Sequence, residues 1–375
     1  MFFCKTVKNP AKITILTAPL DWGLGHATRC IPLIKELNQA GHNVIIAAEG
    51  PTRSLLEQEF PDNLFVSLQG YKIRYSKTSS WLLFTLLLQV PKMLIRVYKE
   101  HLWIKKAVKT YGVDLIISDN RFGLFHGTVP SVYITHQLFI KTGNGFSENM
   151  VQRMHTWIIK RYSECWVPDF ENHPTIAGAL SHPKKLWQNI KYIGCLSRFE
   201  KKDAVKKEFD LLILISGPEP QRGIFETILL DQLNNYNGKV LFVRGLPGGE
   251  SRTSLPVNLP NNNCFVFKEH LASQELCLSI QQSEMVICRS GYTTVMDLIK
   301  LKQKAILIPT PGQPEQEYLA DHLRKQKFFF TVTQDQFRLH ESMSSARLFE
   351  YKFPDTNMDL YKNAVNEFIE NVVVK

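Results

Sequence analysis

The sequence lacks the features that mark secreted, zinc-binding or membrane-spanning proteins. Its seven cysteines are an odd number without a C-x-x-C pair, which argues against a disulfide framework and against a structural zinc site. The apolar run Trp81–Val90 has about half the length that a spanning helix needs. The N-terminus does not have the layout of a signal peptide. We therefore expect a globular protein in a reducing compartment, namely the cytoplasm.

Signatures of several enzyme classes are missing as well. There is no Gly-x-Ser-x-Gly elbow or Ser/His/Asp order of the hydrolases, and no internal repeat of short period. The C-terminal half has no D-x-D pair at the end of a strand, and the chain has no His/Cys cluster. We therefore expect a reaction that needs neither a metal ion nor another cofactor.

The length of the chain predicts two domains, because 375 residues exceed what one ordinary hydrophobic core holds. Residues 12–48 have the pattern of a strand, a helix and a second strand. A polar, lysine-rich stretch at 197–207 precedes a renewed alternation of strands and helices. We predict an α/β protein with two Rossmann-like domains, residues 1–196 and 197–355, followed by an amphipathic segment at 356–375.

Two strand–helix corners in the second half have the character of a nucleotide site. A short apolar strand at 285–288 is followed by Ser290-Gly291 and a helix expected at 293–301, whose N-terminal N–H groups suit a phosphate. Asp297 lies one helical turn after Thr293, where its carboxylate can accept hydrogen bonds from a ribose. A second strand at 305–308 leads to a polar cluster that opens another helix. Neighbouring corners at strand ends predict a nucleotide crevice.

These residues carry a resemblance to a known family. The pattern Arg289-Ser-Gly-x-Thr-x-x-x-Asp297, followed by Pro309-x-Pro and Glu315-Gln316, resembles the C-terminal domain of family 28 glycosyltransferases. These are inverting GT-B enzymes that use nucleotide-sugar donors, and the bacterial lipid-linked N-acetylglucosaminyltransferase of peptidoglycan synthesis is one of them. The chain departs from the family at Asp297, where Glu is usual, and at Glu317, where the family has a second Gln. The resemblance implies the GT-B fold, with a last helix that crosses back to the N-terminal domain.

The resemblance also implies a donor site made of strand ends in the second half. The loop at 216–223 occupies the place of the family's diphosphate-facing loop, although it contains two prolines, and His270-Leu271 corresponds to the segment whose backbone contacts the base. The predicted donor-binding residues are Ser216, Gly217, Arg222, Arg244, His270, Leu271, Arg289, Ser290, Gly291, Thr293, Thr294, Asp297, Gln313, Glu315 and Gln316.

The first half contains a candidate base. Gly23-Leu-Gly25-His26-x-x-Arg29 is expected to form the turn before a helix at 31–39, and it resembles the first loop of this superfamily, where a histidine faces the interdomain cleft. By that resemblance His26 removes the acceptor proton, because an imidazole titrates near working pH. The alternative is a histidine that only caps the helix. As a dinucleotide fingerprint the stretch is weak, since Thr28 replaces the third glycine, although Glu49 stands near the usual acidic position.

Polar residues also follow two predicted strands of the first half, at 115–118 and 131–135. Parallel strands bring their carboxyl ends to one edge of the sheet, where open α/β sheets bind ligands. The alternative is that these side chains only satisfy loop backbone groups. Besides Asp119, the predicted acceptor-side residues are Gly23, Gly25, Asn120, Arg121, His136 and Gln137.

Positive charge is concentrated between residues 71 and 109, which contain nine Lys or Arg and one acidic residue. Beyond Pro91 the pattern predicts a helix with one basic face and an opposite apolar face. We expect peripheral contact of Trp81–Lys109 with an anionic membrane surface, at the inner face of the cytoplasmic membrane. The alternative is a core helix with a solvated basic side, and nucleic-acid binding is not expected. The basic face comprises Lys92, Arg96, Lys99, Trp103 and Lys106, and the opposite face Leu94, Val97, Tyr98 and Leu102.

The predicted function is an inverting hexosyl- or N-acetylhexosaminyltransferase. It would move a sugar from a nucleoside diphosphate-sugar, in the first place a UDP-sugar, to a hydroxyl of a glycan or lipid-linked acceptor of the cell envelope. Alternatives are a nucleotide-sugar epimerase on the same fold and a non-catalytic protein that binds nucleotide-sugars or lipids. An NAD-dependent oxidoreductase would rest on Gly23, Gly25 and Glu49 alone.

Overall fold

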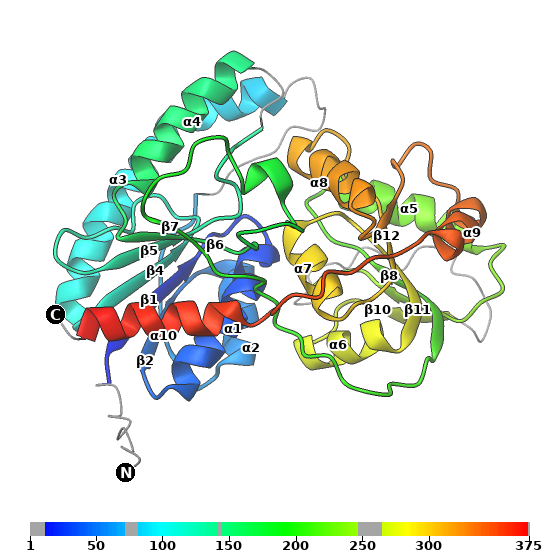
Figure 1. Ribbon diagram of the computed structural model, residues 1–375, viewed down its shortest axis with the longest axis horizontal. Coiled ribbons are helices and arrows are strands. Elements are labelled where there is room, and N and C mark those ends of the chain that lie inside the picture. Colours follow the sequence, from blue (N-terminus) through cyan, green and yellow to red (C-terminus); the bar gives the residue numbers. More distant parts are fainter. Residues whose placement is uncertain (1–11, 72–81, 142–144, 247–264, 374–375) are drawn as a thin grey trace, which may run out of the picture.

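The N-terminal half forms a parallel sheet with helices on both of its faces (Figure 1). The computed structural model describes residues 12–71, 82–141, 145–246 and 265–373. The seven strands lie in the order β3-β2-β1-β4-β5-β6-β7, so that the direction of winding reverses between β1 and β4. The strands are β1 (Thr14–Pro19), β2 (Asn43–Ala47), β3 (Leu64–Val66), β4 (Leu115–Asp119), β5 (Ser131–Ile134), β6 (Glu164–Val167) and β7 (Ile190–Tyr192).

The C-terminal half repeats this plan with a second parallel sheet, in the order β10-β9-β8-β11-β12-β13. Here the winding reverses between β8 and β11, and such switch points are where open α/β sheets hold ligands. The prediction of two Rossmann-like units is thus confirmed. The strands are β8 (Phe209–Leu214), β9 (Val240–Val243), β10 (Phe265–Lys268), β11 (Ser283–Cys288), β12 (Ala305–Leu307) and β13 (Phe330–Thr331).

The helices connect these strands. α10, the red helix of Figure 1, lies on the N-terminal sheet, where the ring of Phe368 meets Trp166 edge to face at 5.8 Å. Its buried residues recur at helical spacing, which explains why this segment folds as an amphipathic helix. The helices are α1 (Leu24–Gln39), α2 (Gly50–Glu59), α3 (Leu82–Tyr111), α4 (Gly145–Ile159), α5 (Gln221–Leu233), α6 (Ser273–Gln281), α7 (Tyr292–Lys300), α8 (Pro314–Lys325), α9 (Leu339–Leu348) and α10 (Leu360–Val373), together with a short 3-10 turn at Gly178–Leu180.

α1 begins earlier than the sequence predicts. The expected turn at 21–29 is helical from Leu24 onward, so His26 lies in the first turn of α1. Gly23 makes this possible, because its φ of +87° is accessible to glycine and lets the chain leave β1 and enter the helix at once. Gly25, His26, Thr28 and Arg29 interrupt the apolar periodicity at the start of the helix, so the sequence pattern predicts a later beginning.

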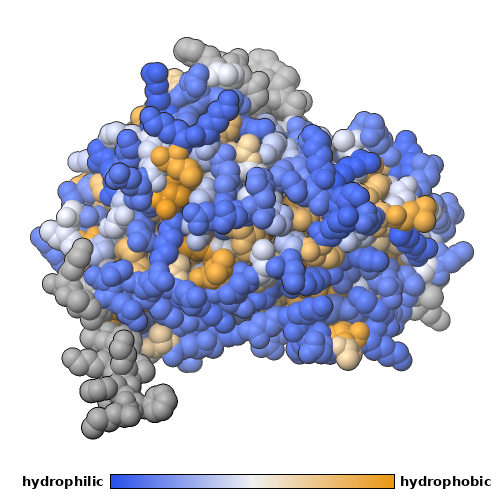
Figure 2. Space-filling view, in the orientation of Figure 1, coloured by the Kyte–Doolittle hydropathy of each residue, from blue (hydrophilic) through white to orange (hydrophobic). Residues whose placement is uncertain are grey.

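α3 is a single helix of 30 residues that includes Pro91. The expected separation into a basic and an apolar face is wrong, because Tyr98 and Leu102 share the exposed side with Lys99, whereas Trp103 packs against the core under the helix. No helix in the described ranges is long and apolar enough to span a membrane. Residues 72–81, and the side chains of 82–90, fall outside the described part of the chain. Figure 2 shows one face of the molecule, on which hydrophobic residues form small spots in a mostly hydrophilic surface.

Candidate active site

The carboxyl ends of the two sheets meet where α7 and α8 of the C-terminal half approach the N-terminal half. The Thr293 hydroxyl donates to the carbonyl of Gly25 at 3.1 Å, and the Tyr292 hydroxyl donates to the carbonyl of Pro168 at 2.5 Å. A side chain at Gly25 would have little room, because an added Cβ would lie 3.3 Å from Thr293 Oγ1. The first turns of α1 and α7, each at the switch point of its sheet, are therefore in direct contact.

His26 stands in this contact region, next to a buried carboxylate. Its Nδ1 lies 3.2 Å from Oδ2 of Asp119, which ends β4 and is fully buried. Arg29, one turn further along α1, donates to both oxygens of Asp119 through Nε and Nη2. Burial alone would raise the pKa of the Asp119 carboxyl, but the charges of Arg29 and His26 outweigh it and hold that pKa below its ordinary value. The site thus contains an ionised carboxylate directly behind an imidazole.

A second histidine links the two domains. His136, two residues after β5, accepts a hydrogen bond at Nδ1 from Nη1 of Arg29 at 3.1 Å, and its Nε2 lies 2.7 Å from Oε1 of Glu315 in α8. Its ring stacks on Tyr292 with centroids 4.1 Å apart and planes 6° from parallel. Burial lowers the pKa of His136, which favours the neutral ring. Because an arginine only donates, the neutral ring carries its proton on Nε2 and donates it to Glu315.

The N-terminus of α7 is free of a side-chain cap. Gly291 occupies the N-cap position without a capping hydrogen bond, and the buried Ser290 hydroxyl is used elsewhere, donating to the Gln316 carbonyl at 2.9 Å. Thr293 and Thr294 in the first turn are partly exposed. An uncapped helix start combines unpaired N–H groups with the positive end of the helix dipole, which suits an anion.

The structure corrects the predicted donor-binding role of the Arg289 side chain. Arg289 is 1% exposed, and its guanidinium donates to the carbonyls of Pro309 and Gln221 at 3.2 and 3.1 Å while lying over the ring of Phe225. Burial lowers the pKa of this arginine to about 10. Its function in the fold is to tie together loops at the carboxyl end of the sheet.

The predicted donor-binding roles of Arg222 and Arg244 are corrected for the same reason, namely burial. Both are buried and donate to the Glu226 carboxylate, while Glu219 and Glu269 complete the network. Two arginines are balanced by three carboxylates, so their charge is already compensated within the domain. Neither guanidinium offers a free positive charge to a diphosphate.

Arg121 and Asn120, predicted on the acceptor side, also have internal roles. The Arg121 side chain is 1% exposed and pairs with the buried Glu100 at 2.9 Å, which removes it from the cleft. Asn120 adopts a φ of +58° after β4, and its Oδ1 accepts a hydrogen bond from the Tyr133 hydroxyl at 2.7 Å. The neighbouring Gln137 is partly exposed beside His136.

Asp297 contacts the segment between the two sheets. Oδ1 accepts a hydrogen bond from the Ser197 hydroxyl at 2.6 Å, and Oδ2 lies 3.7 Å from Nε of Arg198. The carboxylate is 5% exposed, and burial raises the pKa of Asp297 to about 6. The carboxylate is therefore directed to the interdomain segment at Ser197 and Arg198, whereas the sequence pattern predicted that it is open to a ribose.

The other predicted donor residues line the crevice to different degrees. Gly217 is exposed with a φ of +106°, Ser216 and His270 are partly exposed, and Leu271 is buried. Gln316 is occupied by its own loop, since it accepts from the amide of Thr310 and donates to Gln313 at 2.7 Å. Backbone groups and a few half-exposed side chains thus form most of this edge.

The sequence pattern did not assign a role to three residues that organise the site. Arg29 was visible as the last member of the Gly-x-Gly-His-x-x-Arg pattern, three residues after His26 and therefore on the same side of a helix. Tyr292 and Ser197 gave no such signal, because their contacts join segments that are distant in the chain.

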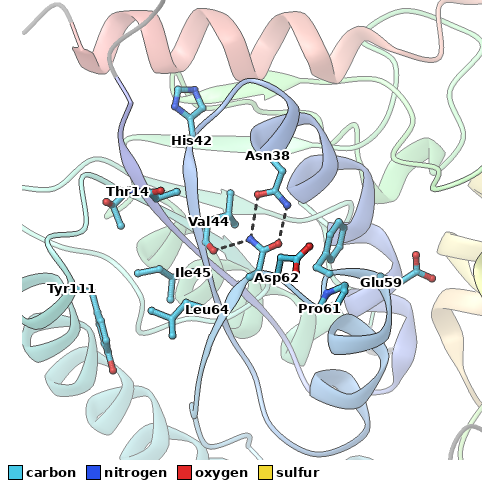
Figure 3. Close-up of a pocket in the computed structure, with 13 residues that line it drawn as sticks. Thr14, Asn38, His42, Val44, Ile45, Glu59, Pro61, Asp62, Leu64 and Tyr111 are labelled. Carbon is cyan, nitrogen blue, oxygen red and sulfur yellow. Dashed lines mark hydrogen bonds between the residues drawn. The ribbon is translucent and has the colours of Figure 1, made fainter.

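A separate cavity of about 710 Å³ lies at the opposite edge of the N-terminal sheet, near the starts of β1, β2 and β3 (Figure 3). Its amide side chains are bonded to each other, with Asn38 Nδ2 donating to Asn63 Oδ1 at 2.9 Å, and Asn63 also donates to the Val44 carbonyl. This cavity is remote from His26, so it is not part of the site at the switch points.

Comparisons with known proteins agree with this arrangement. Residues 259–371 match the model of the glycosyltransferase family 28 C-terminal domain. An uncharacterized glycosyltransferase of Methanosarcina mazei is 22% identical over 327 residues, which cover 79% of this chain and 79% of that protein. A UDP-N-acetylglucosamine--N-acetylmuramyl-(pentapeptide) pyrophosphoryl-undecaprenol N-acetylglucosamine transferase of Nitratiruptor sp. is 21% identical over 243 residues, covering 64% of this chain and 63% of that protein.

Among solved structures, the glycotransferase of kitacinnamycin superposes with a TM-score of 0.62 at 12% identity, over 97% of this chain and 96% of that chain. The fold shared with such neighbours is GT-B. The chain therefore has the GT-B fold and resembles the family 28 glycosyltransferases, whose C-terminal domain model it matches over residues 259–371.

Proposed function

We propose that the protein is an inverting glycosyltransferase that moves a sugar from a nucleoside diphosphate-sugar to an acceptor hydroxyl, with a UDP-sugar as the first candidate donor. One observation carries this proposal: the imidazole of His26, backed by the Asp119 carboxylate, lies beside the uncapped N-terminus of α7. A base and an anion-stabilising helix end are thereby brought to the same place from different domains.

In the proposed reaction Nε2 of His26 takes the proton of the acceptor hydroxyl. The oxygen then forms a bond to the anomeric carbon as the bond from that carbon to the diphosphate oxygen breaks, and the electron pair leaves with the nucleoside diphosphate. A single displacement from the opposite face inverts the configuration. Asp119 stabilises the imidazolium that forms, as a buried carboxylate does behind a catalytic histidine.

The leaving diphosphate requires compensation of its negative charge. We assign this to the first-turn N–H groups of α7 and to the open backbone of the loop at Ser216-Gly217, because the nearby arginines are already paired. The proposed reaction therefore uses no bound metal and no cofactor. Thr293, Gln313 and Glu315, which are partly exposed on the same edge, are proposed to contact the donor.

Asp297 is buried and its carboxylate faces Ser197 and Arg198 of the segment between the two sheets. We therefore propose that its carboxylate holds the interdomain segment in place, and that the ribose is bound by other groups.

The acceptor is proposed to be lipid-linked, because α3 and α4 expose apolar side chains together with positive charge. Tyr98 of α3 is 63% exposed and Trp157 of α4 is 56% exposed, and Lys99 lies on the same stretch of α3. A groove of about 550 Å³ between α3 and the segment that follows α4 is lined by Lys105, Arg161 and other residues. Apolar contact combined with basic residues suits an anionic membrane surface, and this supports the proposal that the enzyme acts at the inner face of the cytoplasmic membrane. The exposed apolar residues are Leu94, Ile95, Tyr98, Leu102, Met150, Met154 and Trp157.

The donor part of the proposal is tested by the melting temperature of the protein with uridine, thymidine and other nucleoside diphosphates, and with NAD. A ligand that binds only the folded state raises the melting temperature. Stabilisation by a nucleoside diphosphate that persists in His26→Ala, together with loss of sugar transfer in that variant, is the expected result. Stabilisation by NAD alone, or unchanged turnover in His26→Ala, would contradict the proposal.

The membrane part is tested separately by sedimentation with vesicles of anionic or neutral lipid. Binding to anionic vesicles is expected to weaken in Tyr98→Glu and to persist in a variant of an exposed apolar residue of the other domain, Leu348→Glu, whose side chain is 89% exposed. Equal binding of all three proteins would contradict membrane contact through α3.

A further inference from the structure

A continuous series of side chains connects the donor domain to the candidate base. Glu315 of α8 lies 2.7 Å from His136, His136 accepts from Arg29 at 3.1 Å, and Arg29 contacts both Asp119 and His26. Arg29 is 2% exposed and Asp119 is fully buried, so the centre of this series is shielded from water.

The position of Arg29 creates a conflict at His26. Nδ1 of His26 lies 2.9 Å from Nη2 of Arg29, which can only donate, and 3.2 Å from Oδ2 of Asp119, which as a carboxylate can only accept. A ring nitrogen carries either a proton or a lone pair, so the two hydrogen bonds cannot exist at the same time in one neutral ring. The bond to Asp119 requires the proton on Nδ1, and the bond from Arg29 requires it on Nε2.

The choice between these tautomers decides whether His26 can act as a base. Among the described residues Nε2 has no hydrogen-bond partner, so it is the nitrogen available to an acceptor hydroxyl. It can take a proton only when the ring's own proton is on Nδ1 and directed to Asp119. The hydrogen bond from Arg29 stabilises the tautomer that cannot do so.

We propose that Arg29 and His136 are positioning residues through which Glu315 of the donor domain determines the tautomer of His26. While Glu315 accepts the Nε2 proton of His136, Nδ1 of His136 holds Nη1 of Arg29, and the other side of the guanidinium holds His26 in the inactive tautomer. When Glu315 is taken by another donor, the His136 ring loses this anchor, and its Nδ1 no longer holds Nη1 of Arg29. The guanidinium is then held by Asp119 alone and turns away from His26, which donates Nδ1–H to Asp119.

This inference rests on the proposed function, because a sugar hydroxyl of the bound donor is the natural competitor for Glu315. Its consequence is that the base becomes active only once the donor is in place. His26 is faced by Asp119 from β4, Arg29 from its own helix and Glu315 from α8, and His136 is faced by Arg29, Glu315 and Tyr292. The charged groups among these belong to the proposed series.

The test measures the tautomer directly, in the absence of any substrate. Protein with ¹⁵N-labelled histidine is examined by NMR, and the His26 ring signals are identified by their loss in His26→Gln. In the wild type Nδ1 of His26 is expected in the unprotonated range. In Glu315→Ala it is expected to move to the protonated range, whereas Asp321→Ala, a variant of an exposed carboxylate on the same helix, leaves it unchanged.

A double variant shows whether the effect passes through His136. His136→Phe keeps a ring to stack on Tyr292 but removes both hydrogen bonds, so Glu315→Ala should have no further effect in that background. A protonated Nδ1 already in the wild type, an unchanged tautomer in Glu315→Ala, or a shift that persists beside His136→Phe would each overturn the proposal. Because no substrate is present, these results do not depend on the reaction, and a chain that transfers no sugar yet shows the shift would overturn only the proposed function.

Discussion

The two sheets present arginines at equivalent edges but use them in opposite ways. In the N-terminal domain Arg29 reaches into the contact between domains and joins Asp119, His26 and His136. In the C-terminal domain Arg289 turns inward and donates to loop carbonyls. The N-terminal edge therefore contributes charged and polar side chains to the site, whereas the C-terminal edge contributes backbone groups and the N-terminus of α7. An arginine in a nucleotide-type motif therefore does not by itself indicate a phosphate ligand.

The same contrast extends to the balance of charge. In the cluster around Arg29 the guanidinium lies between the two histidines His26 and His136, and one carboxylate pairs with each histidine, so a change of protonation there can serve proton transfer. In the described part of the chain, the two arginines Arg222 and Arg244 pair with three glutamates of their own domain. The N-terminal edge is arranged for proton transfer, and the C-terminal edge for shape and for binding an anion.

The largest effect is expected from removing the base of the N-terminal edge. His26→Ala should lower kcat for sugar transfer by about 10²–10⁴-fold, the usual contribution of a general base. The melting temperature should remain near that of the wild type, since His26 is partly exposed. Rates of transfer and thermal unfolding of His26→Ala are compared with those of His340→Ala, an exposed histidine of α9. A kcat equal to that of the control would remove His26 from the mechanism.

Asp119→Ala should combine a loss of turnover with a loss of stability. It leaves the buried Arg29 without its carboxylate, which costs about 3–5 kcal/mol in the free energy of unfolding. Because the pKa of Asp119 is lower in the folded than in the unfolded chain, its contribution is present at neutral pH and is lost as the pH falls below about 4. Urea unfolding at pH 7 and pH 3 measures this, with Asp355→Ala, which is fully exposed, as the control. An Asp119→Ala protein as stable as the control at pH 7 would contradict the assignment.

Arg289→Met tests whether the arginine of the C-terminal edge stabilises the fold or binds the donor. Loss of the guanidinium leaves carbonyls such as those of Pro309 and Gln221 without their donor, which costs about 1–3 kcal/mol. The dissociation constant of the nucleoside diphosphate, measured by calorimetry on the folded variant, should change little. If Arg289 instead bound the diphosphate, affinity would fall sharply while stability would change less, and the contrast between the two edges would be lost.

The overall fold and the position of the site follow from local patterns in the sequence. Apolar strands followed by glycine and polar residues predicted the two sheets, and His26 and Glu315 lie near strand or helix ends that such patterns locate. The partners of those residues were not predictable, because Arg121 pairs with Glu100 and His136 with Glu315 only through contacts between distant segments. For the arginines, burial decides the role, and a motif gives no information on burial.

Asp297 is a carboxylate that, like Arg289, faces inward. Its replacement by asparagine is expected to have the smallest effect on activity and binding. Its pKa of about 6 in the folded protein exceeds the ordinary value of 3.8, so the folded chain binds the extra proton between these values, and stability falls as the pH rises from about 4 to 6. Asp297→Asn keeps a hydrogen-bond acceptor for Ser197 and removes the titration. Its melting temperature should therefore vary less over this pH range than that of the wild type, by the equivalent of at most about 2–3 kcal/mol.

Nucleoside diphosphate should stabilise Asp297→Asn as much as the wild type, since the carboxylate is directed to the interdomain segment. An unchanged pH dependence together with a loss of nucleotide stabilisation would return Asp297 to the ribose. In that case the C-terminal edge, like the N-terminal one, would contribute an ionised side chain to the substrate.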